Sequence, residues 1–421
     1  MKLQRRELLR AAAAASLAAV PLVGRAQRVQ NVVIVGGGFG GATAAKYLRR
    51  FNPALRVTLI EPAEQFLMCP MSNRVIHGGM SLGDISQPYD RFASRHGVRW
   101  VRATADGIDA ERREVRVGAE RIAYDRLIVA PGVEFVYDDL PGLQSASARA
   151  AVPHAWRAGP QTLQLRDMLR DLPPGGTVAM HIPKVPYRCP PGPYERASLI
   201  AYFLQVRNPK AKLLVFDSNP EIQAKKGLFE QVWKTRYPNL IEYVPNAEIE
   251  SVDAGTRTLT LKVQGAQSVD VLNVIPPQRA GAIARGAGLA DVGQRWCGVD
   301  FLTYESTRQR GIHVLGDAIA ASPGMPKSGH MANQQAKVCA GAIAAASLDL
   351  PLPTQPIIAN TCYSFVSQSE AIHVAAVYRY DEKQRTMVAA KEAGGLSGAP
   401  SVAEGLYAVA WAANIMNDTL G

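Results

Sequence analysis

The chain has 421 residues, of which 47% are hydrophobic and 20% are charged, so it can form two or three buried cores and is neither disordered nor fibrous. Its formal net charge is +11, but no run of lysine and arginine marks a nucleic-acid-binding surface. The basic excess therefore indicates an anionic substrate or an acidic partner protein, or a basic surface without a dedicated partner.

The first residues are typical of an export signal. Residues 5–10 (RRELLR) resemble the twin-arginine motif, residues 11–23 are apolar but too few to span a bilayer, and Ala26 ends a stretch suited to cleavage. We therefore predict a twin-arginine signal peptide over residues 1–26 and a mature protein in the periplasm, where disulfides persist. An uncleaved anchor helix is the alternative. No other segment is long and apolar enough to predict a transmembrane helix.

A strand, a glycine-rich turn and a helix follow this segment. The β-branched run Val32–Val35 is typical of a strand buried on both faces. It leads into Gly36, Gly38 and Gly41, which occupy the three glycine positions of a G-x-G-x-x-G turn. The first allows a tight turn, the second lets the backbone approach a pyrophosphate, and the third lets the helix pack closely on the sheet. A second apolar run ends in Glu61, where a ribose-binding acid is expected, so we predict a dinucleotide-binding domain.

Cys69 lies on the loop that comes soon after this acid, which should pass over the cofactor region of the same domain. A cysteine at this place is either a small buried apolar residue or the sulfur of a covalent thioether to a flavin. The residues alone leave both interpretations open.

Two later segments resemble parts of the FAD domain in flavoproteins with two dinucleotide-binding domains. A buried strand ends at Gly132, where the chain leaves such a domain. Another strand runs into Gly316 and Asp317, and the resemblance implies that this aspartate binds the ribityl chain of FAD. A helix predicted over Lys327–Ala340 would direct its N-terminus at the flavin and stabilise negative charge on the reduced form.

A second strand–helix–strand unit lies between these segments, with Thr177–Ile182 and Lys212–Asp217 as strands and Tyr194–Gln205 as the helix. By position it should be a second dinucleotide-binding domain, but residues 183–195 contain prolines where the glycines would stand. Proline fixes the backbone and removes N–H donors that a pyrophosphate would need. We therefore predict that the fold is kept while NAD(P)H binding is lost.

Two cysteines far apart in the chain are candidates for redox chemistry. Cys189 lies in the proline-constrained loop at the head of the predicted helix and beside Arg188, and both features predict a lowered pKa and a reactive thiolate. Cys362 precedes a predicted strand of the C-terminal part. In an oxidising compartment the two could form a disulfide. It would be either a structural staple or, beside a flavin, a two-electron relay open to soft nucleophiles such as sulfide.

The other cysteines and the histidines predict no metal site. The chain has five cysteines but no C-x-x-C or C-x-x-C-H, so we predict no c-type haem and no zinc or iron–sulfur site on it. We expect Cys339 to lie in the core, while Cys297 has no assigned role. The seven histidines are dispersed without metal-ligand spacing.

These segments resemble the flavoprotein subunit of flavocytochrome c sulfide dehydrogenase, a relative of the sulfide:quinone oxidoreductases in the glutathione-reductase-like superfamily. The resemblance covers essentially the whole mature chain. It rests on the FAD turn and, above all, on three cysteine-centred loops: residues 69–73 (CPMSN), 188–196 (RCPPGPYER) and 360–364 (NTCYS).

The resemblance implies a set of site residues and a reaction. FAD would be attached covalently through Cys69, Cys189 and Cys362 would form a redox disulfide over the flavin, and Glu195 would be the acid/base. Hydrosulfide would attack the disulfide, and two electrons would pass to FAD and then singly to a separate c-type cytochrome subunit. Any haem would therefore lie on a partner chain, and the sulfur would leave as polysulfide or elemental sulfur.

The order of the segments and the resemblance together predict an α/β fold. It would contain two Rossmann-like dinucleotide-binding domains, as in glutathione reductase, and a C-terminal α+β domain. The FAD-binding domain should be discontinuous, over residues 27–142 and 277–347. It should enclose a second Rossmann-like domain without an NAD motif over residues 143–276, and an interface domain should cover residues 348–421.

Three alternative functions remain open. A quinone reductase of the same fold would need a membrane-surface pair of amphipathic helices with basic edges, but no lysine or arginine follows Lys391. An NADH-dependent disulfide reductase is disfavoured by the missing second glycine motif and by export from the cytoplasm. A subunit that only docks a cytochrome would not need both relay cysteines.

Overall fold

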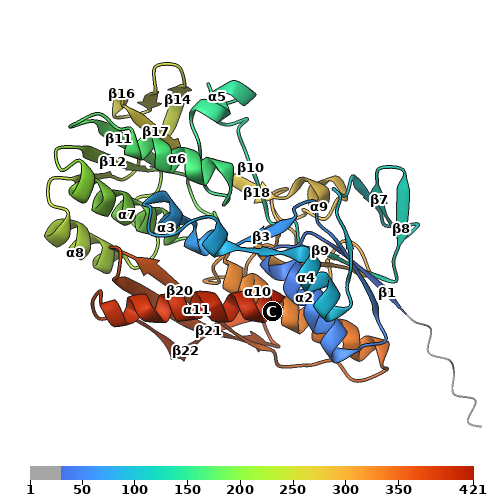
Figure 1. The fold of residues 1–421 in the computed structure, drawn as a ribbon. Helices are drawn as coiled ribbons and strands as arrows, with labels where there is room; N and C mark the ends of the chain where they lie inside the picture. Colours follow the sequence, from blue (N-terminus) through green and yellow to red (C-terminus); the bar gives the residue numbers. More distant parts are fainter. Residues whose placement is uncertain (1–29) are drawn as a thin grey trace, which may run out of the picture.

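A computed structural model describes residues 30–421 of the chain. The signal peptide predicted for residues 1–26 lies outside the described residues. Three main sheets carry three parts of the molecule: two parallel sheets and a C-terminal antiparallel sheet (Figure 1). The predicted α/β class is confirmed.

The first sheet has five parallel strands in the order β19-β9-β1-β2-β5. The strands are β1 (Asn31–Val35), β2 (Arg56–Ile60), β5 (Arg99–Val101), β9 (Arg126–Val129) and β19 (Ile312–Val314). β19 comes from far along the chain, so this sheet joins the N-terminal segment to the segment that follows the second sheet. Its strands read as apolar runs because helices cover a parallel sheet on both faces.

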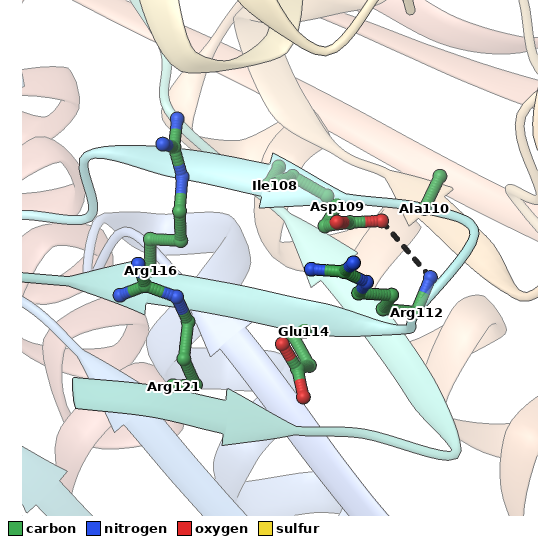
Figure 2. Close-up of a pocket in the computed structure, with 7 residues that line it drawn as sticks. All are labelled: Ile108, Asp109, Ala110, Arg112, Glu114, Arg116 and Arg121. Carbon is green, nitrogen blue, oxygen red and sulfur yellow. Dashed lines mark hydrogen bonds between the residues drawn. The ribbon is translucent and has the colours of Figure 1, made fainter.

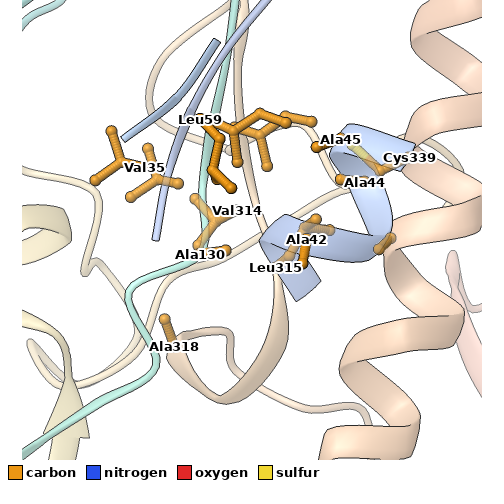
Figure 3. Close-up of a cluster of buried hydrophobic side chains, with 14 of the residues drawn as sticks. Val35, Ala42, Ala44, Ala45, Leu59, Ala130, Val314, Leu315, Ala318 and Cys339 are labelled. Carbon is orange, nitrogen blue, oxygen red and sulfur yellow. The ribbon is translucent and has the colours of Figure 1, made fainter. Parts of the chain in front are cut away.

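Two helices rich in alanine pack against each other: α2 (Phe39–Phe51), which also packs against β1 and β2 of this sheet, and α10 (Gly329–Ser347). Their small side chains let the helices approach closely, and Ala44 and Ala45 lie near Cys339 in the shared core (Figure 3). The prediction that Cys339 is a core residue is confirmed, because it is fully buried there. Burial of this apolar surface is the main stabilising contribution in the domain.

The second sheet has four parallel strands in the order β13-β12-β11-β17. The predicted strand–helix–strand unit is confirmed, and both of its strands have the predicted bounds. The elements of this part are β11 (Thr177–Ile182), β12 (Lys212–Asp217), β13 (Ile241–Val244) and β17 (Val271–Val274), with helices α6 (Pro160–Arg170), α7 (Gly192–Arg207) and α8 (Lys226–Arg236).

The C-terminal part is an antiparallel sheet, β20-β21-β22, with one long helix beside it (Figure 1). Its elements are β20 (Ile357–Phe365), β21 (Ala371–Asp381), β22 (Thr386–Leu396) and α11 (Val402–Leu420). β20 contacts both α7 of the second part and α10 of the first, so this sheet joins the two. Cys362 lies inside β20 and not before it.

Smaller elements connect these parts. The short strands β10 and β18 pair antiparallel between the first and second sheets. The remaining elements have these bounds: β3 (Gln65–Leu67), η1 (Cys69–Met71), α3 (Ser72–Ile76), η2 (Gly83–Ile85), β4 (Ser86–Pro88), α4 (Tyr89–His96), β6 (Gly107–Asp109), β7 (Glu114–Val117), β8 (Glu120–Ala123), β10 (Val133–Phe135), α5 (Ala146–Ala151), β14 (Ile249–Asp253), β15 (Thr258–Leu261), β16 (Gly265–Ser268), β18 (Gln278–Ala280), α9 (Ala282–Gly286) and η3 (Gly316–Ala318).

Candidate functional site

The glycine-rich turn after β1 has the geometry that a bound pyrophosphate needs. Gly36 has φ +96°, and a Cβ there would lie 2.4 Å from the carbonyl oxygen of Ala130. A Cβ on Gly41 would lie 1.8 Å from the Gly36 carbonyl oxygen, so α2 packs directly on the turn. Gly38 faces open space, with no heavy atom within 4 Å of a Cβ built there. The fold therefore requires the first and third glycines, and the second leaves room for a ligand.

Two carboxylates lie at the same end of this sheet. Glu61 accepts a hydrogen bond from the backbone N–H of Gly37 at 2.7 Å, which holds the side chain beside the turn. Asp317 has a buried Oδ1 without a hydrogen-bond partner among residues 30–421, and desolvation raises the pKa of its carboxyl. A buried oxygen without a protein partner is suited to a hydroxyl-bearing ligand. Both carboxylates fit the ribose and ribityl hydroxyls of FAD.

The other two glycines predicted at the cofactor lie at this edge as well. Gly132 and Gly316 come after β9 and β19, and their backbones are left-handed, with φ +64° and +72°. Because β1, β9 and β19 are parallel, their carboxyl ends meet at one edge of the sheet, where folds of this class bind nucleotides. The turn, the carboxylates and these glycines therefore border the same edge.

Lys327 also lies there, but its ammonium is held by the protein. Its Nζ donates hydrogen bonds to the carbonyl oxygens of Asp317, at 3.0 Å, and of Ile319. It lies 3.6 Å from the centre of the Trp296 ring. Burial lowers the pKa of Lys327 to about 8. The helix predicted to begin at this residue begins two positions later, as α10 at Gly329.

Cys69 begins η1, and its sulfur meets the loop that carries Cys189. The Arg188 guanidinium lies 3.7 Å from Cys69 Sγ, and the N–H of Ala158 donates to that sulfur at 3.4 Å. The positive charge of Arg188 also lowers the pKa of Asp317 against the effect of burial, so Arg188 influences the edge of the sheet where FAD is expected. Cys69 is a free thiol in the structure, and its attachment to a flavin stays a prediction.

Cys189 lies just before α7 and Cys362 lies in β20, and these two elements pack against each other. Both cysteines are free thiols in the structure, and they are near enough that a charge on Cys362 raises the pKa of Cys189. Cys189 has a left-handed backbone, with φ +55°, and its N–H donates to the carbonyl oxygen of Lys327 at 2.7 Å. The tertiary structure thus brings together the two cysteines that the resemblance pairs. Their disulfide stays a prediction.

The prediction that Cys189 has a lowered pKa is wrong. Burial raises the pKa of this thiol, and the neighbouring Cys362 and Glu195 raise it further. Arg188 opposes the shift only weakly, because its guanidinium is turned towards Cys69 and the Trp156 carbonyl oxygen. Adjacency in sequence did not put the positive charge beside the sulfur.

Glu195, in the first turn of α7, is a buried acid that is only 5% exposed. Its Oε1 accepts a hydrogen bond from the N–H of Phe365 at 2.8 Å, and its Oε2 accepts one from Asn73 Nδ2 at 3.1 Å. Burial raises the pKa of this carboxyl to about 7, against the opposing effect of both hydrogen bonds and of Lys225 and Arg74. A carboxyl that titrates near neutral pH can accept and release a proton in a reaction.

Sequence reasoning missed two cations beside these residues. Lys225 is 7% exposed and donates to the carbonyl oxygen of Cys362, although no motif marks it. Arg196 is 1% exposed and donates to Asn73, the residue that also holds Glu195. Arg196 lies in one of the loops that carried the family resemblance, so the sequence did contain a sign that it belongs to the site. No sequence pattern indicates Lys225.

The second sheet handles its acid differently. Asp217, at the end of β12, is fully buried and accepts hydrogen bonds from the hydroxyls of Tyr194, at 2.7 Å, and Tyr243, at 2.9 Å. In a dinucleotide-binding domain an acid at this place would bind a ribose. Here the carboxylate already accepts hydrogen bonds from two tyrosine hydroxyls of the protein, which favours the predicted loss of NAD(P)H binding.

Two surface hollows lie elsewhere. One, of about 430 Å³, lies on the β6–β8 meander and is lined by Arg112, Arg116 and Arg121 among others (Figure 2). It contains none of the predicted site residues, so its size does not make it the reaction site. The other, of about 420 Å³, lies between α10 and α11 and is lined in part by Tyr363, the residue after Cys362. Neither hollow is lined by Cys189 or Cys362.

Two kinds of feature are absent from the described part of the chain. Among residues 30–421, no cluster of three or more histidine, cysteine or acidic side chains could hold a metal ion. In the same range, no helix is both long enough and apolar enough to cross a membrane.

Three family descriptions match successive parts of the chain. Residues 30–160 match "Pyridine nucleotide-disulphide oxidoreductase". Residues 162–276 match "Sulfide dehydrogenase [flavocytochrome c] flavoprotein chain, central", and residues 354–420 match "Flavocytochrome c sulphide dehydrogenase, flavin-binding".

Individual relatives agree with these matches. The sulfide dehydrogenase [flavocytochrome c] flavoprotein chain of Chlorobaculum thiosulfatiphilum is 59% identical over 46 residues, which are 96% of that sequence and 11% of this chain. The mitochondrial sulfide:quinone oxidoreductase of Dictyostelium discoideum is 23% identical over 84% of this chain and 79% of its own. The crystal structure of the sulfide:quinone oxidoreductase of Aquifex aeolicus superimposes with a TM-score of 0.78 at 20% identity, covering 93% of this chain and 91% of that one. The superposition confirms the predicted fold.

Proposed function

Because the chain belongs to the family of flavocytochrome c sulfide dehydrogenase flavoprotein chains, we propose that it oxidises sulfide at Cys189 and Cys362 and passes the electrons to a c-type cytochrome. The observation that carries the proposal is that α7, which follows Cys189 and carries the buried acid Glu195, packs against β20, the strand of Cys362. Glu195 accepts a hydrogen bond from the N–H of Phe365 in that strand. The broader class, a sulfide-oxidising flavoprotein oxidoreductase with FAD, follows from the family itself.

Several residues would hold FAD. The open space at Gly38 would take the pyrophosphate, Glu61 a ribose and Asp317 the ribityl chain. When bound, FAD would accept two electrons from the thiols and could release them one at a time. We propose Cys69 as the residue of covalent attachment, on the resemblance and on its position beside Arg188.

The chain's own residues would carry the sulfur chemistry. In the disulfide form of Cys189 and Cys362, hydrosulfide attacks one sulfur, the S–S bond breaks, and one cysteine becomes a persulfide while the other becomes a thiolate. Glu195 takes the persulfide proton, since its carboxyl has a pKa of about 7 and is oriented by two hydrogen bonds. A further sulfide then removes the bound sulfur as polysulfide.

The cytochrome would dock on α11. Its exposed side includes Leu406, 67% exposed, and Tyr407, 60% exposed, and exposed apolar groups of this kind are typical of protein interfaces. Tyr407 also lines the hollow between α10 and α11, together with Tyr363 of β20. The twin-arginine segment at residues 1–26 supports a periplasmic location, where such a partner would meet the folded protein.

A quinone is the second candidate acceptor. The relatives in Dictyostelium discoideum and Aquifex aeolicus are named sulfide:quinone and sulfide-quinone enzymes, and the hollow between α10 and α11 has Tyr363 and Trp411 in its lining. Against it, no basic residue follows Lys391, so α11 lacks the cationic edge typical of a helix that lies on a membrane.

One experiment tests the proposal and separates the acceptors. Purified mature protein would be given sulfide without oxygen, with oxidised cytochrome c, a soluble quinone or NAD⁺ offered in parallel. We expect rapid cytochrome reduction, little quinone reduction and no NADH. Quinone reduction would move the protein to the membrane-surface relatives. If sulfide does not bleach the flavin absorbance, the substrate assignment is wrong and only the fold remains.

A further inference from the structure

Lys225 is a buried lysine whose ammonium is held against the backbone of Cys362. Its Nζ donates hydrogen bonds to the Cys362 carbonyl oxygen at 3.0 Å, to Ser364 Oγ at 2.7 Å and to the Ile372 carbonyl oxygen at 3.4 Å. An ammonium has three N–H donors, so all three are used. The side chain starts at the head of α8 and ends against β20 and β21, which fixes a positive charge beside the dithiol.

The backbone of Lys225 supports this placement. Lys225 has φ +58° and ψ 33°, a left-handed conformation that is unfavourable for a residue with a Cβ. Cys189 is left-handed too, with φ +55°. Such backbone strain is retained where the surrounding contacts hold the residue, and it occurs often at functional sites. The Lys225 ammonium bonds the backbone of Cys362, and a charge on Cys189 is near enough to raise the pKa of that ammonium.

The charge of Lys225 does not act equally on the two sulfurs. Burial lowers the pKa of Lys225 to about 8, and four groups oppose this: Cys362 most strongly, then Glu195, Cys189 and Glu404. In return, Lys225 is the largest influence that lowers the raised pKa of Cys362. For Cys189 the effect of Lys225 is smaller than the opposing effects of Cys362 and Glu195. A negative charge is therefore better stabilised on Cys362.

A hydrogen bond adds to this difference. Asn360 Nδ2 donates to Cys362 Sγ at 3.1 Å, and Asn360 is itself held by Ser328, whose hydroxyl donates to Oδ1 at 2.7 Å. The sulfur of Cys189 lies instead against Gly192, where a Cβ would come within 2.9 Å of it. Since a thiolate leaves faster when it is better stabilised, Cys362 is the better leaving group of the pair.

We propose that Lys225 directs which sulfur receives the incoming sulfide: its ammonium stabilises the thiolate that leaves at Cys362, so that the persulfide forms on Cys189. The inference rests on the proposed function, because it takes sulfide as the nucleophile. Starting from the disulfide form, a bond forms between the sulfide sulfur and Cys189 Sγ. The Cys189–Cys362 bond breaks, its electron pair stays on Cys362, and the persulfide proton passes to Glu195. Lys225 is a positioning residue in this step, since its ammonium bonds the backbone carbonyl of Cys362 and not the sulfur.

The first test needs neither sulfide nor a flavin signal. In the reduced protein, the rate at which iodoacetamide alkylates Cys362 and Cys189 would be followed by peptide mass spectrometry across a range of pH. K225M should slow alkylation of Cys362 by about tenfold or more near neutral pH, with a smaller change at Cys189, because one unit of pKa changes the thiolate fraction tenfold. K226M is the matched control, since Lys226 lies at the surface and pairs with Glu221 at 2.8 Å. Unchanged alkylation of Cys362 in K225M would overturn the inference.

The second test locates the persulfide. Protein in the disulfide form would be mixed with one equivalent of sulfide, alkylated at once and digested. We expect the extra sulfur on the Cys189 peptide in the wild type and on both cysteine peptides in K225M. Absence of a persulfide from both proteins would contradict the proposed function itself. A persulfide shared equally between the two cysteines in the wild type would contradict only the role of Lys225. Should K225M fold poorly, N360A should shift the alkylation in the same direction, and K225R should preserve the wild-type pattern.

Discussion

The two Rossmann-like sheets of this protein share one order of elements and differ in the turn after the first strand. After β1, glycines let α2 pack closely and leave open space at Gly38. After β11, prolines and Cys189 lead into α7. At the end of the next strand, Glu61 stays half-buried beside its turn, whereas Asp217 is fully buried and bound to two tyrosine hydroxyls.

This difference teaches that a turn can change its chemistry while its sheet stays intact. In the first sheet the backbone N–H groups and the helix N-terminus are available to phosphates. In the second, the same position presents a thiol and, within one turn of helix, the buried acid Glu195. One sheet therefore supports a cofactor site and the other supports thiol chemistry, and both sites draw on residues from elsewhere in the chain.

The largest expected effect comes from Cys189 at the second turn and from Cys362 in β20. C189S or C362S should lower sulfide oxidation by roughly a thousandfold or more, since a nucleophile or leaving group is lost, while FAD content stays normal. The rate would be measured by cytochrome reduction and the FAD content by absorbance. C339A, in the core, is the control and should keep its activity. Sulfide oxidation retained in both serine variants would exclude the relay.

Glu195 should give the next largest effect. E195Q should lower the rate by about a hundredfold, because a positioned acid/base is removed. In the wild type the rate should rise with pH through about 7, as the carboxyl ionises, and this limb should be absent in E195Q. The profile would be corrected for the ionisation of hydrogen sulfide, and E221Q, at the surface, is the control. A wild-type profile without this limb would contradict the role of Glu195.

The same carboxyl predicts the pH dependence of stability. The pKa of Glu195 is raised from 4.5 to about 7 in the folded protein, so the folded state binds this proton more tightly than the unfolded state does. Its contribution to stability is therefore present below 4.5 and is lost as the pH rises through about 7. The Tm of E195Q relative to that of the wild type should therefore rise as the pH is raised from below 4.5 to above about 7. A constant difference in Tm would contradict this.

Replacing the two strand-end acids should affect different properties: stability for Asp217 and FAD binding for Glu61. D217A should lower the free energy of unfolding by about 3 kcal/mol, because it leaves two tyrosine hydroxyls without their acceptor. E61A should change stability by less than about 1 kcal/mol but weaken FAD binding. Urea denaturation and FAD titration measure these quantities. If D217A unfolds at the same urea concentration as the wild type, Asp217 is not the structural residue described above.

Gly38 should give the smallest change in stability. G38A should alter the free energy of unfolding of the FAD-free chain by less than about 0.5 kcal/mol, yet lower FAD affinity about tenfold or more, because the methyl group enters the space for the phosphates. G227A is the control: it lies in α8, has no atom within 4 Å of the new Cβ, and should leave FAD binding unchanged. Normal FAD affinity in G38A would move the cofactor away from this turn.

Much of the fold could be predicted because it depends on local patterns. β11 and β12 have the predicted bounds, since apolar runs of six residues ended by turn residues are typical of buried parallel strands. β22 (Thr386–Leu396) was missed, because a strand with lysine, glutamate and two glycines has little β-propensity and depends on pairing with β21.

The sequence by itself determined the two turns, the acid that follows each, and the cysteine-centred loops that carried the family resemblance. Only the tertiary structure decided that β20 packs against α7 and that Lys225 bonds the carbonyl oxygen of Cys362. It also decided that the Arg188 guanidinium lies beside Cys69 and not beside its sequence neighbour Cys189. The physical reason is that desolvation and Coulomb interactions depend on burial and on distance through space. Separation along the chain predicts neither, so the direction of the Cys189 pKa shift could be found only in the folded molecule.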